Sequence, residues 1–379
     1  MQNKRVYLDH ASTSAVHPEV LKSYKELLDT CYVNSESLYD EGTRISRMME
    51  KARSAIAGLL EVDKDEIIFT SGSSESNTSA IKGVCFARMA DRHIITTCIE
   101  HSSIMNACAC MHDVFGYDVT YLPVDQSGRA SLQDLVRALR PDTALVSIMA
   151  VNNEVGSVND IAAMAEYVKK HSRAVFHCDL TQAIGKIDVS LKNIDLASLS
   201  AHKIEGLKGS GILVRRRHVP FVPLINGGEQ EAGLRGGTSN APVNMVFAKT
   251  LRLALENQKK HEAHIRALTD RLLDGLREIG GVEINTPEGA AAGFVNFSYE
   301  PIPSEVMQNA LNRKGFMVSA RSTCDSKNTH ASYVLKAMGF SEKRASSCIR
   351  ATLSYHNTEE EIDAFLKALK EIITQYGTV

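Results

Sequence analysis

The chain has 379 residues and a formal net charge of −2, because 43 Lys and Arg residues nearly balance 45 Asp and Glu residues. That balance gives no electrostatic reason to expect nucleic acid or an anionic membrane as a partner, and a small-molecule substrate fits better. No stretch approaches the roughly 20 apolar residues of a membrane span, and the first residues lack the apolar core of a secretory signal. We therefore expect a soluble protein of the cytoplasm.

The eight cysteines are scattered along the chain without paired short spacings. Reduced thiols are expected rather than a disulfide scaffold or a zinc ribbon. Cys108, Cys110 and His112 form one local group of possible metal ligands. If this segment is a helix, residues two apart point to different faces, so these side chains cannot converge on one ion. The sequence therefore predicts no metal site.

Between about residues 60 and 215, short apolar runs alternate with amphipathic segments, which is typical of a parallel sheet with crossover helices. Several runs are continuous and rich in Val and Ile, as buried parallel strands are. Strands are expected at 66–72, 93–100, 118–124, 143–151, 174–180, 195–200 and 211–216. Helices are expected at 74–90, 131–140 and 160–171.

A glycine-rich passage, "NGGEQEAGLRGGTSN", precedes a long helical pattern from about 241 to 280. The remaining residues indicate a separate, smaller α/β lobe. Strands are expected there at 293–299 and 348–355, and helices at 304–315 and from Thr358 onward. The last helix carries its apolar residues on one face and begins with the Thr-x-x-Glu spacing of a capping box.

Lys203 stands in "SLSAHKIEGLKGSG", between a short apolar run and several glycines. Three interpretations compete: a solvated charge in a loop, a phosphate contact, and a covalent attachment point for a carbonyl cofactor. A dinucleotide fingerprint would need a helix after the glycines, but "GILVRR" reads as a strand. The glycines therefore indicate a tight turn between two strands around the lysine.

A phosphate site is better supported at "FTSGSSESN" (69–77), where an apolar strand ends in small residues and a helix begins. The backbone N–H groups of Gly72, Ser73 and Ser74 would be unpaired at that helix start and would suit a phosphate. An ordinary N-cap made of small residues is an equally good interpretation.

Two further polar residues follow apolar strands. Asp179 stands near the end of the apolar run "FHCDL", and Gln182 follows three residues later. An acid at the carboxyl end of a parallel strand faces the crevice where such folds bind ligands. A cap to the next turn is the alternative. His101 follows "TTCIE", where a stacked ring, an acid/base group and a structural histidine all remain open.

These parts together match the needs of pyridoxal 5′-phosphate: a lysine for an imine, a carboxylate for the pyridine nitrogen, a phosphate cup and an imidazole. A lysine amine with a pKa of about 10.4 is almost wholly protonated at neutral pH, so it cannot attack, and forming an internal imine solves that problem. Asp179 would keep the ring nitrogen protonated.

Several stretches in one order carry a resemblance to a known family: "VYLDHAST", "FTSGSSESN", "IEHSSI", "SIMAVNNEVG", "HCDLTQAIGK", "LSAHKIEGLKGSG", "GLRGGT", "VSARSTC", "SYVLKAMG", "CIRATLS" and "TEEEID". Over nearly its whole length the chain resembles the cysteine desulfurases of the class V aminotransferase group. The resemblance implies a homodimer that converts L-cysteine to L-alanine and passes the sulfur to an acceptor protein.

The implied fold is α/β, the fold type I of pyridoxal-phosphate-dependent transferases. A large domain would have a mostly parallel seven-stranded sheet, and a smaller α/β domain would follow it. The expected divisions are 1–15 for an N-terminal segment joining the small domain, 16–250 for the large cofactor-binding domain and 251–379 for the small domain.

The resemblance also implies a role for matching positions. Lys203 would hold the cofactor as an imine, Asp179 would meet the pyridine nitrogen, and His101 would stack over the ring and serve in proton transfer. The other implied cofactor contacts are Ser73, Ser74, Asn153, Gln182, Ser200 and His202, with Thr238 of the partner subunit joining the two serines at the phosphate.

Cys324 falls where the family's sulfur-accepting cysteine lies, and it would take the sulfur as a persulfide. A thiol with a pKa of about 8.5 is only partly ionised at neutral pH but is already a strong nucleophile. Arg350 would clamp the substrate carboxylate, a bidentate task that suits a guanidinium. Asn153 and Asn34 would also contact substrate. The alternatives are a surface thiol without a role and a structural ion pair.

Departures from the family pattern cluster near these residues: His10, Ser35, Tyr39, Ala201, Glu205, Leu207, Glu229, Ala232 and Arg321. Arg321 would either lower the pKa of the nearby Cys324 or change the loop conformation. The departures leave alternatives open: selenocysteine lyase, cysteine sulfinate desulfinase, a transaminase, or a non-catalytic scaffold of a sulfur pathway. The sequence also leaves open whether the sulfur serves iron–sulfur clusters, tRNA thiolation or a cofactor pathway.

Overall fold

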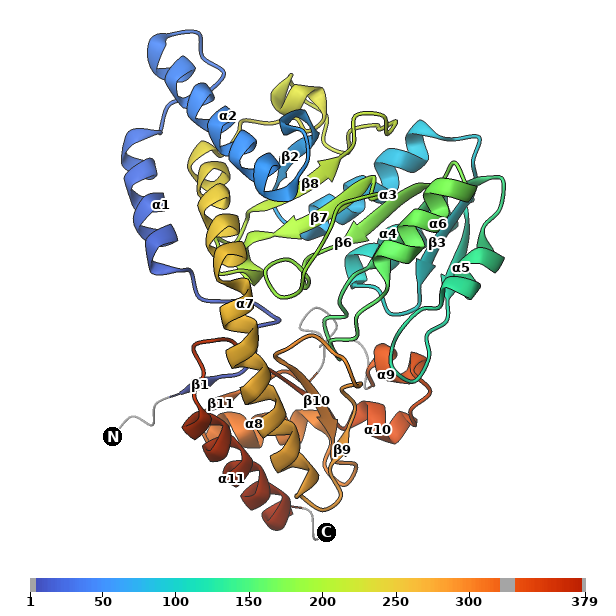
Figure 1. Cartoon of the computed structure of the whole chain (residues 1–379), viewed down its shortest axis with the longest axis vertical. Coiled ribbons are helices and arrows are strands. Elements are labelled where there is room, and N and C mark those ends of the chain that lie inside the picture. Colours follow the sequence, from blue (N-terminus) through green and yellow to red (C-terminus); the bar gives the residue numbers. More distant parts are fainter. Residues whose placement is uncertain (1–4, 321–330, 377–379) are drawn as a thin grey trace.

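The computed structural model describes residues 5–320 and 331–376. Its larger part is built on a seven-stranded sheet (Figure 1). The strands are β2 (Ile67–Thr70), β3 (His93–Thr97), β4 (Asp118–Leu122), β5 (Thr143–Met149), β6 (Val175–Asp179), β7 (Leu196–Ser200) and β8 (Gly211–Arg215). Their order is β2-β8-β7-β6-β5-β3-β4, and β8 alone runs opposite to the other six strands. The predicted mostly parallel sheet is confirmed.

Helices cover both faces of this sheet. They are α2 (Asp40–Leu60), α3 (Ser73–Ala87), α4 (Ser102–Phe115), α5 (Leu132–Ala138), α6 (Ile161–His171) and α7 (Ala241–Arg277). Helix α1 (Pro18–Thr30) packs on α7 instead. Successive strand residues point to opposite faces. Ile94 therefore packs with α3 and α4, whereas Ile95 packs in a second core with α2, α5, α6 and α7.

The smaller part contains two further sheets. Its elements are β1 (Val6–Tyr7), β9 (Glu283–Ile284), β10 (Phe294–Ser298), α8 (Ser304–Arg313), β11 (Phe316–Met317), α9 (Tyr333–Ala337), α10 (Glu342–Ser346), β12 (Cys348–Thr352) and α11 (Glu359–Tyr376). Strands β12, β10 and β9 form an antiparallel sheet, and β1 pairs in parallel with β11. The N-terminal strand thus lies within the smaller part.

Helix α7 runs from the larger into the smaller part (Figure 1). The Asn240 side chain caps its start by accepting a hydrogen bond from Val243 N. Its first half packs on α2, and α11 packs against it farther along. The chain is continuous helix at the predicted boundary between residues 250 and 251, so the division into domains stays a prediction.

The sequence analysis did not predict helix α2, although its signal is present. Its buried apolar residues include Ile45, Met49, Ile56 and Leu60, which recur with the period of one helix face. Helix α4 was considered only as a possibility, and the structure shows it from Ser102 to Phe115.

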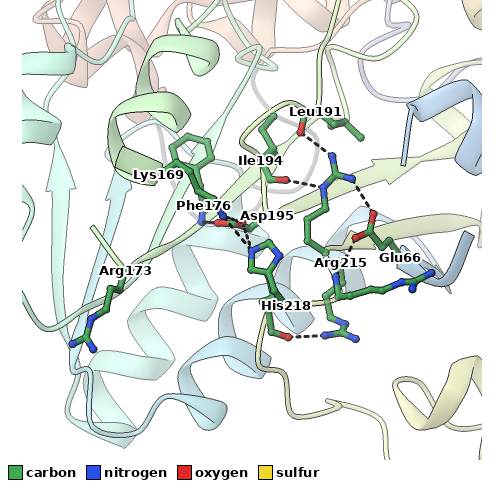
Figure 2. A network of polar contacts seen from close by, with 12 residues as sticks. Glu66, Lys169, Arg173, Phe176, Leu191, Ile194, Asp195, Arg215 and His218 are labelled. Atoms are coloured by element: carbon green, nitrogen blue, oxygen red, sulfur yellow. Dashed lines mark hydrogen bonds and ion pairs between the residues drawn. The ribbon is translucent and has the colours of Figure 1, made fainter. Parts of the chain in front are cut away.

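A polar network fastens the amino end of β7, opposite the end that leads to Lys203. Asp195 accepts hydrogen bonds from Phe176 N (2.9 Å) and His218 Nε2 (2.9 Å) (Figure 2). It also forms an ion pair with Lys169, whose Nζ lies 3.3 Å from Asp195 Oδ1. Its side chain is only 7% exposed. Because Asp195 ties β7 to β6 and α6, the strand that positions the lysine is held firmly at its start.

Within residues 5–320 and 331–376, no helix has both the length and the apolar character needed to cross a bilayer. The same residues contain no group of three or more His, Cys, Asp or Glu side chains arranged to hold a metal ion.

Candidate active site

One cavity of about 510 Å³ lies at the carboxyl ends of the parallel strands. Asp179 is the last residue of β6, Ser200 is the last residue of β7, and His101 follows β3. Strand β2 runs in the same direction as β7, because both are antiparallel to β8, so its carboxyl end reaches the same edge. Ligands bind at this edge in open α/β sheets.

Helix α3 begins at the cavity. Its N-cap is Gly72 with φ 152°, and no side chain caps the helix. A Cβ on Gly211 would lie 2.5 Å from the Gly72 Cα, so glycine is required where β8 passes the helix start. The first-turn N–H groups, from Ser73 onward, have no partners within the helix and suit an anion such as phosphate.

Glu75 stands in the first turn of α3, where its negative charge would oppose an anion. Burial disfavours that charge, but hydrogen bonds from Arg235 and Ser71 lower the pKa of Glu75. Arg235 Nε lies 3.0 Å from Glu75 Oε1 and offsets its charge. The same ion pair fastens the glycine-rich passage before α7 to the start of α3.

Asp179 is held by two donors. Its Oδ1 accepts from Thr181 N (2.9 Å) and its Oδ2 accepts from Asn77 Nδ2 (2.8 Å), and the residue is 4% exposed. Asn77 also donates to Ser103 Oγ (3.0 Å). Because both oxygens are held by donors, the carboxylate has a fixed position, which suits a group that pairs with a ring nitrogen.

His101 is the N-cap of α4 and lines the cavity. Its Nδ1 accepts from Ser103 N (3.2 Å), and Ser103 Oγ lies 2.9 Å from the same nitrogen. A neutral ring in this position carries its proton on Nε2. Ser103 thereby connects His101 to Asn77 and Asp179.

Lys203 ends the short 3₁₀ helix η2 (Ala201–Lys203), after β7. Its Nζ donates to the backbone oxygens of Ala11 and Ser12, both at 2.6 Å. The hairpin predicted around this lysine is confirmed, because β8 returns antiparallel to β7. Burial, followed by the positive charge of Lys203, lowers the pKa of the neighbouring His202 to about 4.

Arg350, on β12, is 2% exposed and reaches the cavity from the smaller part. Its guanidinium donates to Asn153 O (2.8 Å), Asp9 Oδ1 (2.8 Å) and Ser12 Oγ (2.7 Å). Arg350 therefore forms the structural ion pair. The same guanidinium lies at the cavity, as the substrate-clamp interpretation requires. Asp9, which the sequence analysis did not consider, holds the guanidinium in place.

Three buried polar atoms of the cavity lack a hydrogen-bond partner among the residues that the structure describes: Asn153 Oδ1, Thr181 Oγ1 and Arg350 Nε. Buried polar groups are normally paired, so such a cluster fits a polar ligand that supplies the missing partners. With the uncapped start of α3, Asp179 and Lys203, this donor and acceptor set fits pyridoxal phosphate.

Comparisons with known proteins decide the family. The model of the aminotransferase class-V family matches residues 6–365. The chain belongs to the class-V aminotransferase family. This family depends on pyridoxal phosphate, in agreement with the donor and acceptor set of the cavity.

Curated relatives of this class-V protein extend over nearly its whole length. The cysteine desulfurase IscS of Methanosarcina thermophila is 38% identical over 376 residues, which cover 98% of this chain and 93% of that protein. The mitochondrial cysteine desulfurase of Arthroderma benhamiae is 41% identical over 381 residues, which cover 98% of this chain and 75% of that protein. The resemblance predicted from the sequence motifs is confirmed.

Solved structures agree in fold. A NifS-like protein has a TM-score of 0.92 and 38% identity and covers 98% of this chain and 100% of its own. A structure described as "SspA in complex with cysteine" has a TM-score of 0.81 and 32% identity and covers 93% of this chain and 99% of its own. The predicted fold is thereby confirmed.

The structure brings most, but not all, of the predicted site residues of this class-V protein together. The cavity is lined by Ser73, Ser74, His101, Asn153, Asp179, Gln182, Ser200, His202, Lys203 and Arg350. Asn34 and Thr238 are exposed and do not line it. Cys324 and Arg321 lie outside the described residues.

Three residues that support the site were missed by the sequence analysis. Asn77 and Thr181 hold Asp179, and Asp9 holds Arg350. All three lie within the quoted family stretches, but side-chain pairing across 102 or 341 residues leaves no local pattern. The one feature of the sequence that points to them is that they lie in the same motifs as the predicted site residues.

Glu100, directly before His101, is buried and offers a pH-dependent prediction. Burial raises its pKa to about 8, although Met149 N (2.9 Å) and Thr97 Oγ1 (2.7 Å) both donate to Oε1. The folded protein thus holds a proton that the unfolded chain releases near pH 4.5. Stability is full below that pH and is lost as pH rises through about 8.

We therefore expect Glu100→Gln to stabilise the protein by about 5 kcal/mol at pH 8.5 and by less than about 1 kcal/mol at pH 5, measured by urea unfolding. The exposed Glu256→Gln is the control and should change stability by less than about 1 kcal/mol at both pH values. An equal gain for Glu100→Gln at both pH values would contradict the interpretation.

Proposed function

We propose that this chain is a pyridoxal-phosphate-dependent cysteine desulfurase. It would take sulfur from L-cysteine as a persulfide on Cys324 and release L-alanine. The observation that carries the proposal is the convergence of Lys203, Asp179, the start of α3 and Arg350 on one cavity. The curated relatives named as cysteine desulfurases support the choice of reaction.

The cofactor would be held by residues of several elements. Lys203 would be its attachment point, Asp179 would meet the ring nitrogen, and His101 would stack over the ring. Further contacts would come from Ser73, Ser74, Asn153, Gln182, Ser200 and His202, with Thr238 of the partner subunit. Bound there, pyridoxal phosphate supplies an electron-accepting ring that stabilises negative charge on the substrate.

Arg350 would bind the substrate carboxylate. Hydrogen bonds to Asp9 and Asn153 O already orient its guanidinium, so substrate binding would not have to restrict the motion of this side chain. The Nε group and Asn153 Oδ1 are the buried polar atoms that remain for a ligand among the described residues of this corner. Asn34 is proposed as a further substrate contact.

Two groups of the cavity are suited to moving protons. Lys203 Nζ can carry a proton, and the His101 ring, whose Nδ1 accepts from Ser103 N, would exchange protons at Nε2. The hydrogen-bonded chain through Ser103 and Asn77 fixes this ring relative to Asp179.

Cys324 would be the nucleophile for sulfur. Its thiolate would attack the sulfur of the bound substrate, so that a sulfur–sulfur bond forms as the carbon–sulfur bond breaks and the carbon takes up a proton. The proposal draws support from the described residues before and after this segment: Ser319 pairs with Arg350, and Ser332 Oγ donates to Glu154 Oε2 (2.6 Å), next to Asn153.

The test is to incubate the protein and its Cys324→Ser variant with L-cysteine and map persulfides by mass spectrometry. We expect the wild-type chain to carry a persulfide at Cys324 and to release alanine. The variant should lose alanine formation by at least about 100-fold, as removal of a nucleophile does, while its visible absorbance stays unchanged. Cys110→Ser, in α4, is the matched control. Full alanine formation by Cys324→Ser would overturn the persulfide route.

The proposal includes a homodimer and a sulfur-acceptor protein. A residue that acts in the site of a partner subunit must be exposed and must lie outside the cavity of its own subunit. Thr238 and Asn34 have such positions. Arg235 anchors the segment that carries Thr238 to the start of α3. The cysteine bound to the SspA structure supports cysteine as the substrate.

A further inference from the structure

A second cavity, of about 110 Å³, adjoins Lys203, which lines both this cavity and the larger one. Its walls come from the N-terminal segment, the turn after β6, η2, α7 and the strands β10 and β12. Protein interiors are close-packed, and voids larger than one water molecule are few. The volume corresponds to about four water molecules, so one small organic molecule fits the same space.

Most of the wall of this second cavity is apolar. The apolar side chains include Val20, Ile204, Leu253, Ile265, Phe294 and Leu353. Small-molecule sites are typically lined in this way, with a small number of polar groups that fix the orientation of the ligand. An occupant of this cavity therefore needs an apolar body.

Lys186 is one of the polar groups in the wall. It follows Gly185, which has φ +72°, and a Cβ at this glycine would lie 3.0 Å from Ala254 Cβ of α7. The turn is therefore packed tightly on α7 and presents Lys186 at a defined place. Lys186 Nζ donates to Gln182 Oε1, and among the described residues no carboxylate forms an ion pair with Lys186. An ammonium group has three N–H donors, so donors remain for a ligand.

The surroundings of Lys186 lack a negative charge to balance it. Burial, followed by the positive charges of Lys203 and Arg350, lowers the pKa of Lys186 to about 7. The Phe294 ring, whose centroid lies 5.3 Å from Lys186 Nζ, supplies only a weak contact. Because a desolvated ammonium is unfavourable without a partner of opposite charge, an anion in the cavity would stabilise the charged form of Lys186.

Two carboxylates line the cavity, but neither pairs with Lys186. Glu205 accepts hydrogen bonds from Tyr355 Oη (2.6 Å) and His356 Nε2 (2.8 Å), which engage its two oxygens. Glu262 lies on α7 and is partly exposed to solvent. The place of an anion beside Lys186 is therefore left to a ligand.

His10 is a second polar group that lacks a partner. It lines the cavity, and its Nδ1 is buried without a hydrogen-bond partner among the residues that the structure describes. Burial, followed by the charge of His356, lowers the pKa of His10 to about 4, so the ring is neutral near pH 7. A neutral ring with its proton on Nδ1 can donate to a carboxylate. His10 and Glu205 are both departures from the family pattern, so the polar lining of this cavity departs from that pattern too.

We propose that this second cavity is a binding site for a short-chain monocarboxylate, whose carboxylate pairs with Lys186 and accepts from His10 and whose apolar chain packs on the apolar wall. Such a ligand touches Ile204 of the larger part and Leu353 of the smaller part, so its binding stabilises their association. A positive group on the ligand would be disfavoured by Lys186 and Lys203, which excludes amino acids as the preferred class.

The test uses propionate as the probe and ligand-observed NMR with the cofactor-loaded full chain at pH 6.5, where Lys186 keeps most of its charge. We expect propionate to bind with a Kd of about 1 mM. Propionamide has nearly the same shape without the charge and should bind at least about tenfold more weakly. Lys186→Gln should weaken propionate binding at least about tenfold, whereas Lys192→Gln, at an exposed lysine of the same connection, should not.

Two further variants locate the bound propionate. Arg350 lines only the larger cavity of the two, so Arg350→Lys should leave binding in the second cavity unchanged. Leu253→Phe fills the second cavity without changing a charge and should abolish binding. If Lys186→Gln does not fold, Leu253→Phe makes the same comparison.

Three results would overturn this site: no binding of propionate, equal affinity for propionate and propionamide, and propionate binding that persists in Lys186→Gln but is lost in Arg350→Lys. A purely structural role of Lys186 would lower the melting temperature of Lys186→Gln and leave its propionate affinity unchanged. The proposed function fails on a different result, the absence of a pyridoxyl group on Lys203 after borohydride reduction.

Discussion

The Lys203→Ala variant is expected to form alanine from L-cysteine at least ~10³-fold more slowly than the wild-type chain, because in the proposed function this side chain would serve as both attachment point and proton carrier. Lys203 Nζ donates to two backbone oxygens, Ala11 O and Ser12 O, so the variant also leaves these acceptors without this donor. The measurement is alanine release, together with borohydride reduction and peptide mass spectrometry to locate the cofactor.

Lys208 provides the matched control for Lys203. It lines the same cavity five residues later and is exposed. Lys208→Ala should keep the pyridoxyl group on Lys203 after borohydride reduction, whereas Lys203→Ala should carry none. A Lys203→Ala variant that still formed alanine at the wild-type rate would remove the basis of the proposed function.

The Arg350→Met variant is expected to show the largest loss of stability, about 3 kcal/mol, since removing one partner of a buried pair leaves the other without compensation. Arg350 is 2% exposed and donates to Asp9, Ser12 and Asn153 O. If it also binds the substrate carboxylate, the KM for L-cysteine should rise roughly 10- to 100-fold in any folded variant. Urea unfolding and steady-state kinetics measure the two effects separately.

Arg271 is the control for an exposed pair. It forms ion pairs with Glu359 and Asp363 on α11, and its side chain is 42% exposed. Arg271→Met should change stability by no more than about 1 kcal/mol and leave the KM unchanged. Arg350→Lys retains the positive charge but cannot bind a carboxylate in a bidentate way. An unchanged KM in this variant would show that Arg350 has only a structural role.

Much of the larger part was predictable from the sequence, because its signals are local. Strands were expected at the positions of all seven strands of the large sheet, from β2 to β8, and the buried parallel ones are continuous apolar runs. Polar residues directly after such runs, among them His101 and Asp179, were expected at one edge, since parallel strands end at the same edge. The cavity gathers them there.

The residues that hold these side chains in place were not predictable in this way. The hydrogen bond from Asn77 to Asp179 joins residues 102 positions apart, and the ion pair from Arg350 to Asp9 joins residues 341 positions apart. A hydrogen bond depends on distance and angle within a few tenths of an ångström. No periodicity along the chain encodes that geometry.

The sequence by itself thus determined which residue types stand at the strand ends and, through the order of its motifs, the family. Only the tertiary structure decided that Lys186 lies behind Lys203 and that the N-terminal segment supplies the acceptors for the Lys203 amine. The physical reason is that hydrophobic periodicity is a property of neighbouring residues, whereas the proximity of two charges depends on how distant segments pack.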